Sequence, residues 1–462
     1  MPINNFLLPG AKVTPAYEVA NSCRFNAADS AYMTRTFGSA GNRRTWTFST
    51  WCKRAKFGAQ QTLFGSSADG SNYHLFYWGS DETLTHNFSG TTTSASGKFR
   101  DPSAWYHVVC AVDTTQSTAA NRVKLYVNGV SVGSGSYPAE DAEMILNNNV
   151  RCDVGSSGAH FTSHMLGGYL AESVFIDGTQ YAASDFGEFD EDSPNIWKPK
   201  DVSGLTFGTN GFYFDYEDSA NLGNDANGGT DWTETNLAAS DQMTDTPTLN
   251  YATWNPLSVA TSAQPAFSQG NLQVITPVSG TGWSISTIGA TSGKWYLEIY
   301  VVAYASLDRT AIGITGDISG SLAGNTNIGL LTNSLDVGYW QNGYSAVGNS
   351  TDTDYGDTFA VGDLMGIALN IDDNEVIFYK NNTAQNSGTA ISFTAGSTYH
   401  FCLNDGSNGG GNTTVANFGQ DGTFAGNKTA QGNADGAGYG DFFYTPPTGF
   451  YALNTKNLAE YG

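Results

Sequence analysis

The segment RVKLYVNGVSV, residues 122–132, constrains the fold more than any other stretch of the chain. Val123, Leu125 and Val127 alternate with Arg, Lys and Tyr, so the three apolar side chains share one face of an extended strand. Asn128-Gly129 follows, and this dipeptide favours a two-residue hairpin turn because both residues tolerate positive φ. The segment therefore predicts two adjacent antiparallel strands with one apolar face.

The same alternation recurs along the chain. GYLAESVFIDG at 168–178 sends Leu170, Val174 and Ile176 to one side and ends in an Asp-Gly turn. KWYLEIYVV at 294–302 and the pair LMGIALNID and EVIFYKNNT at 364–383 repeat the pattern. These runs predict antiparallel sheets in both halves of the chain.

Composition supports an all-β fold. Only 14% of the 462 residues are charged, whereas Gly (55), Phe (26) and Tyr (24) are abundant. Helical proteins are richer in Ala, Leu, Glu and Lys, and a disordered chain would carry fewer aromatic residues.

Charge excludes some partners. Asp and Glu outnumber Lys and Arg by 43 to 20, which gives a formal charge of −23. We therefore expect no nucleic-acid partner, because phosphate binding needs clustered cations. No run of 18 apolar residues occurs, so we expect no membrane insertion either.

The alternating runs and the irregular stretches divide the chain into four parts. We expect a first sandwich over 1–184, an ordered irregular connector over 185–256, a second sandwich over 257–440 and a packed C-terminal tail over 441–462. The connector carries Trp197, Trp232 and Trp254, and a flexible linker would leave their large apolar surfaces exposed.

The first half of the chain resembles the laminin-G and concanavalin-like lectin sandwich. The matching elements are a W-x-H-V strand (Trp105, His107, Val108), the K-L-Y-V-N-G hairpin and the late strand G-Y-L-A-E at 168–172. The run from Asn21 to about residue 229 is also similar to a family of bacteriophage and prophage virion proteins. The resemblance implies a jelly roll and a virion protein.

The second half resembles the SPRY (B30.2-like) sandwich. GKWYLEIYVV at 293–302, GDLMGIALNIDDNEVIFYKNN at 362–382 and VANFGQDGTF at 415–424 match three of its motifs in order. The two resemblances together imply two antiparallel β-sandwiches, concanavalin/laminin-G-like and then SPRY-like, joined by a Trp-, Asn- and Gly-rich connector. Both folds are scaffolds on which the loops are specialised.

Catalytic patterns are incomplete. Glycosidases on concanavalin-like folds use E-x-D-x-x-E, and Glu188-Phe-Asp190 begins such a string. The second Glu is replaced by Ser193, and Pro194 follows it. The two-carboxylate mechanism then has no acid/base partner, so we predict that the protein is not an enzyme.

One loop could hold Ca²⁺. NLGNDANGGTD places Asn224, Asp225, Asn227 and Asp231 in a Gly-rich turn, and oxygen ligands at such spacing suit this ion. The same residue types also stabilise metal-free turns by bonding to nearby backbone amides, so both interpretations stay open. No other cofactor is indicated.

Two aromatic clusters are candidates for sugar contacts, because sugar rings have apolar faces that stack on aromatic rings. Tyr73, His74 and Trp78 form the first cluster, and Trp340, Asn342 and Tyr344 form the second. Since side chains alternate along a strand, part of each run belongs to the core.

These features favour a tail-fibre or appendage adhesin that carries lectin-like modules to the host surface. Its partners would be other virion proteins and a host-surface glycan or protein, and we expect a homo-oligomer located in the virion after synthesis in the host cytoplasm. The alternative is a capsid or tail decoration or connector protein without receptor binding. A polysaccharide depolymerase is a third hypothesis.

Overall fold

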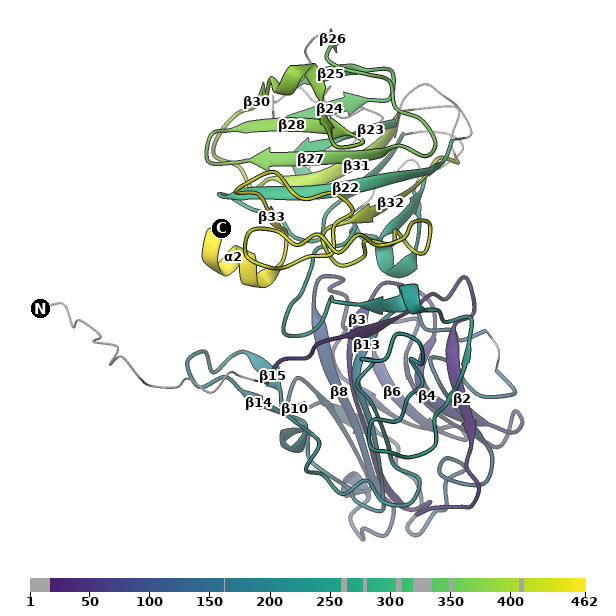
Figure 1. Ribbon diagram of the computed structural model, residues 1–462. Helices are drawn as coiled ribbons and strands as arrows, with labels where there is room; N and C mark the ends of the chain where they lie inside the picture. Colours follow the sequence, from purple (N-terminus) through teal and green to yellow (C-terminus); the bar gives the residue numbers. More distant parts are fainter. Residues whose placement is uncertain are drawn as a thin grey trace, which may run out of the picture.

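A computed structural model describes residues 17–161, 163–258, 264–276, 281–304, 310–318, 335–348, 350, 352–406 and 411–462. The chain forms two antiparallel β-sandwiches, one above the other, as Figure 1 shows. The predicted all-β fold class is confirmed. Among the described residues the single α-helix is α2 (Thr455–Tyr461), and none of the helices there is long and apolar enough to cross a membrane.

The first sandwich consists of two eight-stranded sheets. One runs in the order β10 (Val130–Ser131), β9 (Val123–Val127), β8 (Trp105–Asp113), β3 (Thr45–Arg54), β13 (Gly168–Asp177), β1 (Ser22–Phe25) and β18 (Gln242–Met243), with β16 (Phe212–Phe214) also on β13. The other runs β11 (Gly133–Gly135), β7 (Thr91–Ala95), β6 (Leu84–Phe88), β5 (Tyr73–Trp78), β4 (Gln61–Ser67), β12 (Arg151–Val154), β2 (Tyr32–Thr36) and β17 (Thr233–Thr235).

The local sequence explains how β9 pairs with β10. Val127 pairs with Val130 across the turn, where Asn128 and Gly129 have φ of 47° and 78°. The predicted hairpin is therefore present. Leu125 and Val127 point into the core between the sheets, where Phe48 of β3 stacks on Phe64 of β4 with ring centroids 4.7 Å apart.

The segment 185–256 contributes to the first sandwich. Its strands β16, β17 and β18 join the two sheets, and Trp232 is buried between them, 4.7 Å from Phe212. Strands of two or three residues are too short to show alternation, which is why no local pattern predicts them. Only β14 (Gly187–Phe189) and β15 (Trp197–Pro199) form a separate hairpin.

The second sandwich has sheets of nine and six strands. The larger runs β19 (Ala266–Ser268), β20 (Gln273–Ile275), β32 (Thr413–Asn417), β22 (Lys294–Ala303), β27 (Leu364–Asn370), β28 (Glu375–Lys380) and β29 (Thr383–Ala384), with β30 (Ile391–Ser392) on β28 and β33 (Tyr451–Ala452) on β22. The smaller runs β21 (Thr281–Ile285), β31 (His400–Gly406), β23 (Thr310–Thr315), β24 (Asp336–Trp340), β25 (Tyr344–Val347) and β26 (Thr353–Asp354).

The C-terminal tail packs on the second sandwich. β33 pairs in parallel with β22, and Phe442 is buried with its ring centroid 5.3 Å from that of Tyr296. Phe443, Tyr444 and Phe450 are half-buried. In Figure 1 the yellow tail runs along the end of the second sandwich that faces the first.

Buried ion pairs connect the two sandwiches. Arg24 of β1 lies 2.7 Å from Asp421 of the second sandwich and 3.2 Å from Asp241, and its side chain is 1% exposed. The Tyr169 hydroxyl donates to the Gly270 carbonyl across the same seam at 2.7 Å. Because a buried charge is costly without its partner, these contacts hold the sandwiches in one arrangement.

Candidate functional site

The structure corrects part of the first aromatic cluster. His74 and Trp78 are buried inside the first sandwich, because their positions on β5 face the opposite sheet. His74 contacts Trp46 and His86, whereas Trp78 lies against the Arg54 guanidinium. The predicted ligand contact at these two residues is therefore wrong. Tyr73 is half-buried, with its ring 5.3 Å from that of Phe161.

The second aromatic cluster divides in the same way. Trp340 is 6% exposed and belongs to a small core with Trp283 and Cys402, so its predicted ligand contact is also wrong. Asn342 and Tyr344 are exposed at the turn between β24 and β25, where the Asn342 side chain accepts from the Tyr344 amide. These two residues remain accessible to a ligand.

The predicted Ca²⁺ loop uses most of its carboxylate oxygens internally, although Asp225 Oδ2 is buried without a hydrogen-bond partner among the described residues. Asp225 is 3% exposed, and its Oδ1 accepts from the amides of Tyr213 and Asn227. Asp231 accepts from the Asp225 amide and from the Asn221 side chain. Asn224 and Asn227 complete the turn, and no group of three His, Cys, Asp or Glu in the described part of the chain is arranged to hold a metal. These contacts are those of an Asx-stabilised turn.

Glu188 and Asp190 lie on the exposed β14–β15 hairpin. Both carboxylates approach the Lys198 ammonium, at 3.6 Å and 3.2 Å. Hydrogen bonds from Ser193 and Lys198 lower the pKa of Asp190. A glycosidase acid needs a raised pKa, so Asp190 is unsuited to act as the proton donor of such chemistry.

A buried serine–histidine pair is also unsuited to catalysis. His107 Nε2 lies 2.8 Å from Ser49 Oγ, and Trp197 Nε1 donates to His107 Nδ1 at 3.0 Å. The donor from Trp197 leaves the ring proton on Nε2, so the imidazole donates to the serine and cannot accept its proton. Burial also lowers the pKa of His107 to about 3.

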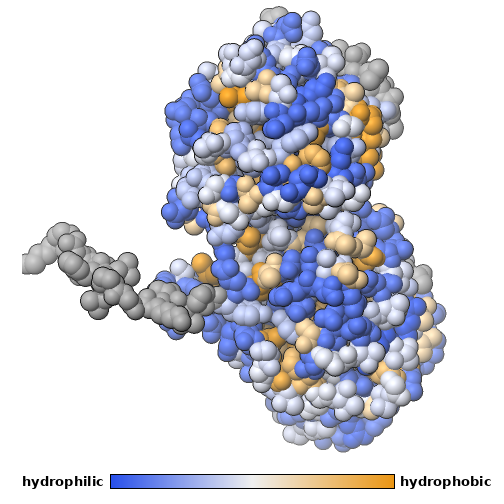
Figure 2. Space-filling view, in the orientation of Figure 1, coloured by the Kyte–Doolittle hydropathy of each residue, from blue (hydrophilic) through white to orange (hydrophobic). Residues whose placement is uncertain are grey.

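A cavity of about 310 Å³, here called the interdomain pocket, lies where the two sandwiches meet. Figure 2 shows a narrow waist at this level of the molecule. Small-molecule sites occur preferentially at such domain junctions and span about 300–1,000 Å³. The pocket is lined from the first sandwich by Phe25, Asn26, Ala27, Ala28, Ala55, Lys56, Phe57 and Gly167, and from the later part of the chain by Pro256, Phe267, Ser268, Gly270 and Asn271.

A strained turn forms the upper wall of the interdomain pocket. Gln269, Gly270 and Asn271 have φ of 51°, 64° and 66°, three successive left-handed residues. Gly270 is required here, because a Cβ would lie 2.1 Å from the Tyr169 hydroxyl oxygen. Non-glycine residues in this conformation are costly and cluster at functional sites, so the turn itself marks the pocket.

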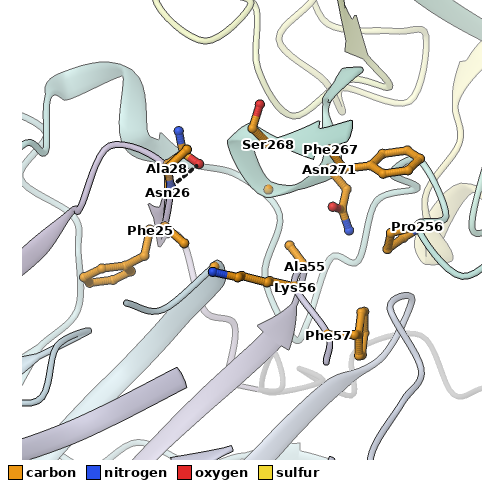
Figure 3. Close-up of a pocket in the computed structure, with 13 residues that line it drawn as sticks. Phe25, Asn26, Ala28, Ala55, Lys56, Phe57, Pro256, Phe267, Ser268 and Asn271 are labelled. Carbon is orange, nitrogen blue, oxygen red and sulfur yellow. Dashed lines mark hydrogen bonds between the residues drawn. The ribbon is translucent and has the colours of Figure 1, made fainter. Parts of the chain in front are cut away.

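Asn271 carries the most informative side chain. It is 2% exposed, yet its carboxamide makes no hydrogen bond to any described residue. In Figure 3 this side chain extends from the second sandwich into the pocket, on the side of Pro256. Neither polar atom of this carboxamide is completely enclosed, so both face the space of the pocket, where a bound polar ligand can take the place of water.

The other walls combine polar and aromatic groups. Asn26 is 7% exposed and donates to Asp29 at 2.5 Å, while its Oδ1 accepts from the Ala28 amide. Phe57 and Phe267 are half-buried, and Figure 3 places them beside Pro256 at one end of the pocket. The pocket therefore offers apolar ring faces together with carboxamide groups.

A second hollow of about 390 Å³ lies beside Glu188, lined by Tyr126, Phe189, Trp197 and Lys200 among others. It is aromatic, but Trp197 already donates its indole N–H to His107 and the Lys200 ammonium already donates to the Ser184 carbonyl. The interdomain pocket is the stronger candidate, because its Asn271 carboxamide extends into the cavity without a hydrogen-bond partner among the described residues.

Sequence reasoning missed the interdomain pocket. Its lining comes from five separate stretches of the chain, and none of them contains a recognisable motif. The one local signal is Gln269-Gly270-Asn271, because Gly and Asn are the residues that tolerate positive φ.

Comparison with known proteins agrees with the first fold assignment. The profile of the Concanavalin A-like lectin/glucanases superfamily, Laminin_G_3, matches residues 26–186. The match spans most of the first sandwich, without β1 and without its last three strands, and covers less than half of the chain. No curated protein matches the sequence.

Solved structures of similar proteins include β-sandwich domains. The SPRY domain of human HERC1 is 15% identical, with a TM-score of 0.29, and the match covers 35% of this chain and 96% of that one. A second human SPRY domain is 14% identical, with a TM-score of 0.25 and coverage of 31% and 90%. A heptameric SAP-like pentraxin from Limulus polyphemus is 13% identical, with a TM-score of 0.28 and coverage of 35% and 78%.

Proposed function

We propose that the protein binds carbohydrate in the interdomain pocket and has no catalytic role. The observation that carries this proposal is the buried Asn271 carboxamide, which has no hydrogen-bond partner among the described residues and extends into a cavity with aromatic walls.

Carbohydrate fits the pocket because of its mixed chemistry. A sugar ring presents hydroxyl groups that both donate and accept, and C–H faces that pack on aromatic rings. Asn271 and Asn26 can exchange hydrogen bonds with hydroxyls, while Phe57 and Phe267 can cover an apolar face. The lectin/glucanase profile supports the same class of ligand, and its match includes the pocket residues 26–28 and 55–57.

A biological setting follows as part of the proposal. The resemblance of the first half to phage virion proteins supports a tail-fibre or appendage adhesin, which would attach the virion to a host-surface glycan. A single pocket of this size binds weakly, so we expect several copies to act together, because multivalency raises avidity. A decoration or connector protein, held in the virion by neighbouring proteins, is the second candidate function.

The binding proposal is tested with the full chain and one conservative change. Asn271→Gly removes the carboxamide and keeps a residue that tolerates φ of 66°. We expect the unmodified chain to bind members of a glycan array, and the variant to lose at least about tenfold in affinity for them, since one charged or neutral hydrogen bond is worth about 1–3 kcal/mol. Binding that survives unchanged in Asn271→Gly would place the site elsewhere.

Asn386→Gly is the matched control. Asn386 is also an asparagine at positive φ, 50°, but it is exposed in the loop after β29 and is not among the residues that line the interdomain pocket. Its replacement should leave glycan binding unchanged. Host-cell adsorption measured in competition with the purified protein separates an adhesin from a decoration protein, because only an adhesin should compete.

A further inference from the structure

We infer that the ligand of the interdomain pocket is an acidic sugar, one that carries a carboxylate as uronic and sialic acids do, and that Lys56 binds this carboxylate. The inference rests on the proposed carbohydrate function and specifies its substrate class.

Lys56 supplies an unneutralised positive charge. It lines the interdomain pocket, it is exposed, and it makes no ion pair or hydrogen bond through its ammonium with any described residue. Most other Lys and Arg side chains in the described part of the chain form ion pairs or hydrogen bonds. Lys53, three residues earlier, is buried against Asp245 at 2.6 Å, and Arg54 lies 2.6 Å from Glu82.

The pocket lining contrasts with the rest of this acidic protein. The chain has 43 acidic and 20 basic residues, yet the 13 residues that line the pocket include one lysine and no Asp or Glu. Asp29, the carboxylate nearest to these residues in the hydrogen-bond network, accepts from Asn26 and from Gln269. The lining residues themselves therefore carry one positive charge and no negative one, and a positive charge facing the cavity favours an anionic ligand.

Lys56 and Asn271 can act on the same ligand from two sides of the pocket. Figure 3 shows the Lys56 side chain running toward the side of Phe25, whereas Asn271 extends into the pocket from the second sandwich on the side of Pro256. A carboxylate suits the ammonium, because it accepts hydrogen bonds and carries the opposite charge, and the Asn271 carboxamide suits a hydroxyl group of the same sugar. The remaining carboxamide, Asn26, and the Phe57 and Phe267 rings are then left for the hydroxyls and the ring face.

A carboxylate fits better than a phosphate or sulfate group. Those anions are usually bound by several cations or by a series of backbone N–H groups, often with Arg in bidentate geometry. The pocket has one ammonium and no Arg. A single positive charge beside two carboxamides matches the single negative charge of a sugar acid.

The test compares sugars that differ only in charge. Methyl glucuronide, methyl galacturonide and N-acetylneuraminic acid are titrated into the full chain by calorimetry, alongside methyl glucoside, methyl galactoside and glucose 6-sulfate. We expect at least one sugar acid to bind about tenfold more tightly than its neutral counterpart, and the difference to shrink as salt is added, because the ammonium is exposed to solvent.

Lys56→Gln should reduce the affinity for the sugar acid to the level of its neutral counterpart. Lys98→Gln is the control, since Lys98 is an exposed lysine outside the pocket lining, and its replacement should change nothing. Unchanged melting temperatures would show that both variants are folded.

The outcomes separate the two proposals. Equal binding of acidic and neutral sugars, or a preference for the sulfate, would overturn the carboxylate inference and leave carbohydrate binding in place. Acid-selective binding that persists in Lys56→Gln would also overturn it. Failure of every sugar and of the glycan array to bind would overturn both the inference and the proposed function.

Discussion

The two sandwiches are each completed by the segment that follows them, and they hold that segment by different forces. In the first sandwich Phe212, Phe214 and Trp232 enter the core between the sheets. In the second, the amides of Phe443 and Tyr444 donate to the two oxygens of the buried Glu298, each at 2.8 Å. The first segment is thus part of an apolar core, whereas the second packs on the outside of a sheet through the Phe442 ring, the pairing of β33 with β22 and the hydrogen bonds to Glu298.

Loss of the apolar packing that holds the first segment should lower the free energy of unfolding more than loss of the polar contacts that hold the second. Trp232→Ala removes a buried ring that packs against Phe212 and Phe214, so we expect the free energy of unfolding to fall by about 3–5 kcal/mol. Urea denaturation followed by circular dichroism measures the change. Phe189→Ala, at a side chain that is 46% exposed, is the control and should cost far less. A small effect of Trp232→Ala would show that the segment is dispensable to the core.

The difference between the two segments also explains what could be predicted. The hairpin at Asn128-Gly129 and the strands β27 and β28 could be predicted, because strands of five or more residues show their alternation. The strands β16, β17 and β18 have two or three residues each, and their positions depend on partners 37 to 221 residues away. No local sequence pattern predicts such long-range pairing.

The candidate site was the least predictable part. Aromatic runs at Tyr73–Trp78 and Trp340–Tyr344 indicated ligand contacts, but alternation along a strand does not tell which face meets the opposite sheet. His74, Trp78 and Trp340 are buried for this reason. The interdomain pocket arises only when two domains meet, and its strained Gln269–Asn271 turn is held by Tyr169 of the other sandwich.

Lowering the pH should destabilise chiefly the first sandwich. Burial lowers the pKa of His86 to about 3, and it also lowers the pKa values of His74 and His107. The unfolded chain takes up protons at these groups below about pH 6.5, whereas the folded one does not, so stability is lost as the pH falls from 6.5. Each of these histidines should lower the free energy of unfolding by about 2 kcal/mol by the time the pH has fallen to 5.

The variant His86→Leu tests the predicted direction of this pH effect on stability. It should remove about 2 kcal/mol of the stability lost between pH 7 and pH 5, as measured by urea denaturation at both values. Glu298 and Glu172 act in the opposite direction, since burial raises the pKa of each to about 7 and their contribution is lost as the pH rises from about 4.5 to 7. An unaltered pH dependence in His86→Leu would contradict the assignment of the acid effect to buried histidine.

Replacing one oxygen of the Glu298 carboxylate should weaken the hydrogen bonds that hold the C-terminal tail. In Glu298→Gln only one side-chain oxygen remains to accept the two backbone amides, and the new N–H₂ group faces the other amide. We expect a loss of about 1–2 kcal/mol in unfolding free energy, with faster hydrogen exchange confined to residues 441–454. Glu375→Gln, on β28 of the same sheet and free of ion pairs among the described residues, should change stability by less than about 0.5 kcal/mol.

The smallest effect is expected at the exposed hairpin between β24 and β25, and it decides between two sites. Tyr344 is 41% exposed, so Tyr344→Ala should change stability by less than about 0.5 kcal/mol. Tyr344 and Asn342 remain accessible as sugar contacts, but the hairpin lacks the enclosure and the unpartnered buried amide of the interdomain pocket. Glycan affinity should therefore fall much less in Tyr344→Ala than in Asn271→Gly. If Tyr344→Ala abolished binding while Asn271→Gly preserved it, the hairpin would be the site, and the second sandwich alone would carry the recognition that we assign to the junction of the two.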